Sequence, residues 1–246
     1  MLAIIGGTGL SRLSVFTPAE SRAVQTTWAA QPVTLEIMKH HGKDLVFLPR
    51  HGANHAVPPH RVNYRANIAA LQEVGVTSII AVNAVGGIHP DMGPGALMLP
   101  DQIIDYTHGR AATFFEDDLD VVTHIDFSDP FSALERRQLS QVLEDCNDHR
   151  VVLGSGVYGV TQGPRLETAA EITRLQRDGC DVVGMTAMPE AALAREAGLG
   201  YGMLALSVNW AAGLTPEPIT MDQIRGVLAD GMALIATVLD TYASRY

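Results

Sequence analysis

The chain of 246 residues contains only two cysteines and has more acidic than basic side chains. Cys146 and Cys180 lie far apart in sequence without a C-x-x-C pair, which argues against a zinc ribbon or a disulfide scaffold. Reduced thiols in a cytoplasmic protein are the expectation. The formal net charge of −10 argues against nucleic acid or another long polyanion as partner. A small anion remains compatible, because backbone NH groups and a few cations can bind one inside an acidic protein.

The sequence also lacks a signal-peptide start, an apolar run of about 18 residues and any linker or repeat that would divide it. We therefore expect one soluble domain over residues 1–246, located in the cytoplasm, with no membrane partner. Because 47% of the residues are hydrophobic, the chain can bury a sizeable core.

Short apolar runs alternate with helical patterns along the chain, which predicts an α/β domain with a central sheet flanked by helices. Several runs are continuous, as in strands that are covered on both faces. The expected strands are 2–5, 45–49, 76–85, 151–160, 182–185 and 201–208. The expected helices are 61–75, 130–145, 167–179, 189–198 and 221–242. Residues 108–129 show neither period and are expected to form a long functional loop.

The first expected strand runs into the glycine-rich segment GGTGL, which includes Gly7 and Thr8. A dinucleotide fingerprint G-x-G-x-x-G fails here, because Arg12 stands where the third glycine belongs. The segment fits either a phosphate-holding turn or a tight structural turn.

Two further strands end in residues that suit an anion. The segment LPRHGANH places Arg50 and His51 at a strand end, with His55 four residues beyond. Arginine offers a planar fork of donors for phosphate oxygens, whereas the His51 and His55 spacing lacks the glutamate of a helical metal motif. Asn83 and Ala84 end the next strand. Since ligands gather at the carboxyl ends of strands in α/β folds, these ends predict an anion site and no metal.

Catalytic motifs built on a protein nucleophile are missing. Gly154-Ser155-Gly156 lacks the spacing of a G-x-S-x-G elbow, and no convincing acid and base pair is present. If the protein is an enzyme, a substrate supplies the nucleophile and the site activates it by position and electrostatics.

Seven segments together resemble the trimeric purine nucleoside phosphorylase family, most closely its methylthioadenosine phosphorylase branch. They are GGTGL, LPRHGANH, PHRVNYRANIAAL, VNAVGGI, QGPRLETAAE, GMTAMPEAALAREAG and LALSVN. The resemblance implies a phosphorylase-like α/β fold, a homotrimer, phosphate as co-substrate, and no metal or organic cofactor. It also implies that phosphate attacks C1′ of a nucleoside while the purine leaves.

The resemblance also assigns roles to residues of this chain. Asn209 and His51 are the implied catalytic residues. The implied phosphate ligands are Thr8, Arg50, His51, Asn83, Ala84 and Thr186. The implied nucleoside contacts are Leu166, Glu167, Met185, Asn209, Ala211, Met221, Ile224 and, from a neighbouring subunit, His124.

Several positions depart from the family pattern. Leu166 stands where an aromatic residue is common, and Asn83 and Gly87 replace hydroxyl residues in the phosphate loop. Adenine-cleaving relatives resembling this chain carry carboxylates at the Asn209 and Ala211 positions.

The base-site residues match a 6-oxopurine. The Asn209 amide can donate to O6 and accept from N7-H, while Glu167 accepts from N1-H. On the 5′ side, Met221 and Ile224 suit a methylthio group, although Met221 also fits a simple core position. The leading hypothesis is phosphorolysis of 5′-methylthioinosine. The alternatives are cleavage of methylthioadenosine, a broader inosine and guanosine phosphorylase, and a purine-binding module without enzymatic activity.

Overall fold

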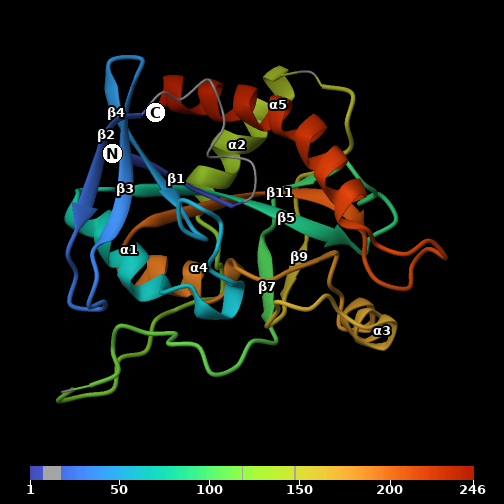
Figure 1. Cartoon of the computed structure of the whole chain (residues 1–246), viewed down its shortest axis with the longest axis horizontal. Helices are drawn as coiled ribbons and strands as arrows, with labels where there is room; N and C mark the ends of the chain where they lie inside the picture. Colours follow the sequence, from blue (N-terminus) through green and yellow to red (C-terminus); the bar gives the residue numbers. More distant parts are fainter. Residues whose placement is uncertain (8–17, 118, 147) are drawn as a thin grey trace.

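The structure is a computed structural model that describes residues 1–7, 18–117, 119–146 and 148–246 (Figure 1). Within these residues, eleven strands form one mixed sheet with helices on both faces, as predicted. The strands are β1 (Leu2–Gly6), β2 (Pro18–Val24), β3 (Val33–His40), β4 (Lys43–Pro49), β5 (Ser78–Gly87), β6 (Leu97–Met98), β7 (Gln102–Asp105), β8 (Val152–Leu153), β9 (Val157–Val160), β10 (Val182–Gly184) and β11 (Gly200–Trp210). The helices are the 3-10 helix η2 (Pro59–Arg61), α1 (Tyr64–Glu73), α2 (Ala133–Cys146), α3 (Ala169–Arg177), α4 (Ala187–Glu196) and α5 (Met221–Arg245).

Strand β5 is the branch point of the sheet. It pairs in parallel with β1 from Ser78 to Ala81, and with β11 along its whole length. Its last residues, Gly86 and Gly87, pair antiparallel with β10. Between Ala81 and Gly86, β1 has ended and the pairing with β10 has not begun, so one edge of β5 turns from one neighbour to another. Such a switch point is where ligands bind in α/β sheets.

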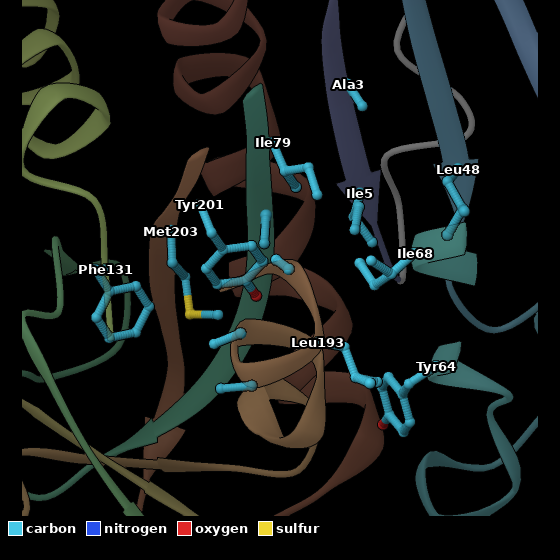
Figure 2. Close-up of a cluster of buried hydrophobic side chains, with 14 of the residues drawn as sticks. Ala3, Ile5, Leu48, Tyr64, Ile68, Ile79, Phe131, Leu193, Tyr201 and Met203 are labelled. Atoms are coloured by element: carbon cyan, nitrogen blue, oxygen red, sulfur yellow. The ribbon is translucent and has the colours of Figure 1, made fainter. Parts of the chain in front are cut away.

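The central strands are covered on both faces, because alternate side chains point to opposite sides of a sheet. Ala3 and Ile5 of β1 belong to a buried cluster that includes Ile68 of α1 and Leu193 of α4 (Figure 2). Leu2 and Ile4 of β1 belong to a second buried cluster, which includes residues of α2 and α5. This two-sided burial explains the continuous apolar runs of the sequence.

Capping boxes open α3 and α5. Thr168 accepts from the backbone of Glu171, whose side chain returns to the Thr168 backbone, and Thr220 and Gln223 form the same pair. Each box satisfies donors that a helix start leaves without intrahelical partners.

Helix α5 is long and apolar enough to cross a membrane by length and composition, a property that the sequence patterns did not predict. Of the apolar 18-residue stretch of this helix, 56% is buried within the protein. The buried residues of α5 pack in the same cluster as Leu2 and Ile4 of β1. This packing is typical of a core helix.

The structure adds strands that the apolar patterns missed. Strand β2 is largely exposed from residue 20 onward, and β3 mixes buried and exposed residues. Strand β6 has two residues, and β7 begins and ends with the exposed polar residues Gln102 and Asp105. The predicted strand 151–160 is split into β8 and β9. The described residues of the predicted loop 108–129 contain no helix or strand, and the loop extends away from the sheet (Figure 1).

Candidate functional site

A cavity of about 500 Å³ opens at the carboxyl ends of β4, β5, β10 and β11. It brings together twelve of the fourteen predicted site residues: Arg50, His51, Asn83, Ala84, Leu166, Glu167, Met185, Thr186, Asn209, Ala211, Met221 and Ile224. Thr8 lies outside the described residues, although the preceding Gly7 lines the cavity. Three strand ends that the sequence suggested as one anion site therefore do meet.

Arg50 is the buried cation of this cavity, and its orientation is fixed by Glu190. The guanidinium donates through Nε to Glu190 Oε2 at 2.7 Å and through Nη2 to Glu190 Oε1 at 2.8 Å. Both side chains are 1% exposed. Although burial opposes the charge, the adjacent Glu190 carboxylate raises the pKa of Arg50, so the guanidinium stays charged. Its Nη1 lies 3.8 Å from the position of a β-carbon built on Gly7.

Asn83 links the buried arginine to Thr186. Its Oδ1 accepts from Arg50 Nη2 at 3.0 Å, and its Nδ2 donates to Thr186 Oγ1 at 2.8 Å. The same Nδ2 lies 3.3 Å from the Tyr158 hydroxyl. Since the Thr186 oxygen accepts from Asn83, its own proton can be donated to an anion in the cavity. The Asn83 side chain therefore positions two anion-binding groups.

His51 is held neutral beside Arg50. Its Nδ1 lies 2.7 Å from the Val57 carbonyl oxygen, so Nδ1 carries the proton and Nε2 is an acceptor. Burial lowers the pKa of His51 from its usual 6.5 to about 4, assisted by the Arg50 charge and by His55 and opposed by the Val57 bond. A neutral His51 can accept a hydrogen bond from a protonated phosphate oxygen through Nε2.

The base-facing carboxylate predicted at Glu167 has a partner that the sequence did not reveal. Thr161, just beyond β9, donates its hydroxyl to Glu167 Oε1 at 2.5 Å. This bond occupies one carboxylate oxygen, and the other remains an acceptor that can face a ligand. A hydroxyl six residues before a carboxylate is too common a pattern to have identified the pair.

Asn209 enters the cavity from an irregular stretch of β11. The pairing of β11 with β5 shifts after Ser207, so that Ser207 lies opposite Val85 and Asn209 opposite Gly86. A bulge re-aims side chains and is common next to active sites. The amide Nδ2 donates to the Trp210 carbonyl oxygen at 2.7 Å, which leaves one N–H and Oδ1 for a ligand.

The opposite side of the cavity is apolar. Met221 and Ile224 of α5 line it together with Met185, as predicted. Met221 is 59% exposed, so it lies at the rim instead of in the core. Leu166 is 46% exposed at the same cavity, and Ala211 is buried.

Gly87, which replaces a hydroxyl residue of the family pattern, has a packing reason to lack a side chain. A β-carbon there would overlap the carbonyl oxygen of Met92. That carbonyl accepts a hydrogen bond from Ser207 Oγ at 2.7 Å. A hydroxyl side chain at this position would therefore require the Met92 backbone to move.

Arg110 is a further residue that sequence reasoning missed. It begins the long loop and donates to the carbonyl oxygens of Met185 at 2.9 Å and of Gln162 at 2.9 Å. It also reaches the carbonyl oxygen of Thr161 at 3.3 Å. Arg110 thereby fixes the segment that precedes Glu167 and the chain at Met185. In the sequence, the only signal for Arg110 was its position in the expected functional loop 108–129.

His124 is exposed on the long loop and is absent from the described lining of the cavity. The resemblance assigned it to the substrate of a neighbouring subunit, so its role stays a prediction about an assembly.

Comparisons with known proteins agree with the fold. Residues 1–244 match the Phosphorylase superfamily. A probable S-methyl-5′-thioinosine phosphorylase of Pseudomonas syringae pv. tomato is 53% identical over 239 residues, covering 96% of each chain. A probable 6-oxopurine nucleoside phosphorylase of Thermococcus kodakarensis is 40% identical, over 93% of this chain and 86% of its own.

Solved structures give the same result at the level of the fold. The methylthioadenosine phosphorylase of Schistosoma mansoni in complex with adenine superposes with a TM-score of 0.92 at 31% identity. The similarity covers 98% of this chain and 90% of that one. From the matched sequence and the shared fold, the chain belongs to the phosphorylase superfamily.

Proposed function

We propose that this protein cleaves 5′-methylthioinosine with phosphate, giving hypoxanthine and 5-methylthioribose 1-phosphate. The observation that carries the proposal is that Glu167 and Asn209 line the same cavity as Arg50, His51 and Thr186. One wall thus offers groups for a 6-oxopurine and another offers groups for an anion. Relatives at 53% and 48% identity named probable S-methyl-5′-thioinosine phosphorylases support this substrate.

The base is selected by matching donors with acceptors. Glu167, oriented by Thr161, accepts from N1-H of hypoxanthine, and the remaining N–H of Asn209 donates to O6. Adenine presents a lone pair at N1 and an amino donor at position 6, so both contacts would fail. At about 1–3 kcal/mol for each unpaired buried group, the preference for the 6-oxopurine spans tens to thousands of fold. Ala211 provides no carboxylate for a 6-amino group.

The 5′ substituent is selected by the apolar wall. Met221 and Ile224 leave a 5′-hydroxyl without a partner but can pack against a methylthio group. Met185, which also lines the cavity, is assigned to the ribose.

The reaction is a displacement at C1′. A phosphate oxygen forms the new C1′–O bond while the C1′–N9 bond breaks and its electron pair goes to the purine. As the purine leaves, N7 takes a proton from solvent and Asn209 Oδ1 accepts a hydrogen bond from the new N7–H. Arg50, His51 and Thr186 hold phosphate against a ribose with oxocarbenium character, so positioning and electrostatics lower the barrier.

We also propose an oligomeric state and a cellular location for the enzyme. We infer one nucleoside phosphorylase domain over residues 1–246 that works as a homotrimer, in which His124 of a neighbouring subunit approaches the 5′ end of the substrate. Partners are a small nucleoside and phosphate, without nucleic acid, membrane, metal or organic cofactor in the reaction. The unpaired thiols Cys146 and Cys180 suit a reducing cytoplasm.

Phosphate-dependent cleavage of methylthioinosine, methylthioadenosine, inosine and adenosine tests the proposal. Methylthioinosine should be cleaved fastest, and EDTA should leave the rate unchanged. Comparable turnover of methylthioadenosine would contradict the base assignment. Equal turnover of inosine would favour the broader 6-oxopurine activity suggested by the relative at 40% identity. Purine release without phosphate would indicate a hydrolase, and no release from any of them would indicate a binding module.

A further inference from the structure

We propose that His40, His41 and Asp240 form a binding site for a divalent late first-row transition metal ion, with Zn²⁺ as the expected occupant. Among the residues that the structure describes, they are the one group of three side chains whose ligand atoms converge closely enough to hold a metal. The group joins the β3 and β4 hairpin to helix α5 and lies outside the catalytic cavity.

The two imidazole nitrogens both approach the same carboxylate oxygen of Asp240. Asp240 Oδ1 lies 2.8 Å from His40 Nε2 and 3.5 Å from His41 Nε2. All three atoms lie within 4.8 Å of one another. Around tetrahedral Zn²⁺, bonds of about 2.0–2.1 Å separate ligand atoms by about 3.3 Å. The observed separations are therefore within about 1.5 Å of the separations that the ion requires.

The hairpin turn brings the two imidazoles to the same side. Along a strand, neighbouring side chains point to opposite faces, so two adjacent histidines would normally diverge. Here His41 has a φ of +47° and Gly42 a φ of +77°, in a turn closed by the pairing of His40 with Lys43. Positive φ at both central residues is what a two-residue hairpin turn of this kind requires, and histidine is among the residues that tolerate it. The turn thus departs from strand geometry at His41 and allows both imidazoles to lie beside the same carboxylate.

The surroundings hold the ligands while leaving room for water. The His40 side chain is 11% exposed, whereas those of His41 and Asp240 are 49% and 40% exposed. Close to them in sequence, Met38 of β3 and Leu239 of α5 belong to one buried cluster. The hairpin and the helix thus contribute to the same core, and an ion would meet ligands on a preformed frame whose exposed side leaves coordination positions for water.

The donor chemistry selects the class of ion. Two imidazoles and one carboxylate suit Zn²⁺, Ni²⁺ or Cu²⁺, whereas Mg²⁺ and Ca²⁺ prefer oxygen ligands. A simple ion pair between His40 and Asp240 is the competing explanation, but it does not account for the second imidazole beside the same carboxylate oxygen. Asp240 follows Met221 by 19 residues on the same helix, which corresponds to about 28 Å. The ion would stabilise the docking of α5 without taking part in the reaction.

Calorimetric titration of the untagged protein in phosphate-free buffer tests the site, with ZnCl₂ as probe and MgCl₂ as comparison. The expected result is one Zn²⁺ per chain, a higher melting temperature with Zn²⁺, and neither effect with Mg²⁺. His41→Gly, which suits the turn, and Asp240→Asn, which keeps the side-chain shape, should each weaken Zn²⁺ binding by more than about tenfold.

His55→Ala is the matched control, because His51 and His55 are another pair of neighbouring imidazoles, with ring centres 4.7 Å apart. This variant should bind Zn²⁺ like the unmodified chain. The proposal is overturned if the unmodified protein binds no Zn²⁺, if His41→Gly and Asp240→Asn bind it unchanged, or if His55→Ala abolishes binding.

Discussion

Replacing Asn209 by aspartate should shift the enzyme from 6-oxopurine toward 6-aminopurine nucleosides. The Asn209 amide has one N–H left after its bond to the Trp210 carbonyl oxygen at 2.7 Å. Aspartate exchanges that donor for an acceptor, so the contact with O6 becomes unfavourable and a contact with a 6-amino group becomes favourable.

The size of the shift follows from these two contacts. One mismatch of about 1–3 kcal/mol and one new hydrogen bond of about 1 kcal/mol change the preference by about 2–4 kcal/mol, or roughly thirty- to several-hundred-fold. The carboxylate would also face the Trp210 oxygen, which costs stability with either substrate and leaves the ratio unaffected.

The assay is the ratio of kcat/KM for methylthioinosine to that for methylthioadenosine, measured with saturating phosphate. Asn209→Ala is the control, because it removes both the donor and the acceptor and should slow both substrates without favouring adenine. A ratio for Asn209→Asp that equals the unmodified ratio, with phosphorolysis retained, would show that the amide does not read position 6.

Three further predictions concern the frame of the site. Glu190→Gln leaves the buried Arg50 without its counter-ion, so the free energy of unfolding should fall by about 3–5 kcal/mol in urea titrations. Added phosphate should stabilise this variant more than the unmodified chain, and equal stabilisation would contradict the prediction. A methyl group on Gly87 would overlap a backbone carbonyl oxygen, so Gly87→Ala should destabilise by about 2 kcal/mol or more, whereas Gly226→Ala, in open space on α5, should not destabilise. Because the pKa of His51 falls from 6.5 to about 4 on folding, the unfolded chain binds more protons between these values, and stability should drop as pH falls from 6.5 to 4. The loss is at most about 3 kcal/mol, lessened by solvent screening of the partly exposed ring, and His51→Gln should flatten this part of the pH profile.

The sequence predicted the elements whose burial leaves a clear pattern. Central strands such as β1 and β11 are covered on both faces and appear as continuous apolar runs. The β2 and β3 hairpin and β7 are more exposed, so their side chains carry no such run. Short strands such as β6 are fixed by their partners and leave no local signal.

The candidate site divides in the same way. Arg50 could be predicted because strand ends carry ligands in this class of fold, whereas the role of Asn209 was implied by the family resemblance. Glu190 could not, because it meets Arg50 across 140 residues of sequence and its segment reads as an ordinary helix. Arg110 has its partners on strand ends that only the folded chain brings together.

The most direct test of the central claim is the ratio of kcat/KM for methylthioinosine and methylthioadenosine in the unmodified protein, with phosphate present and then omitted. The arrangement of Glu167 and Asn209 predicts phosphate-dependent release of hypoxanthine at least tens of times more efficient than release of adenine. Equal efficiency, or a preference for methylthioadenosine, would contradict the account.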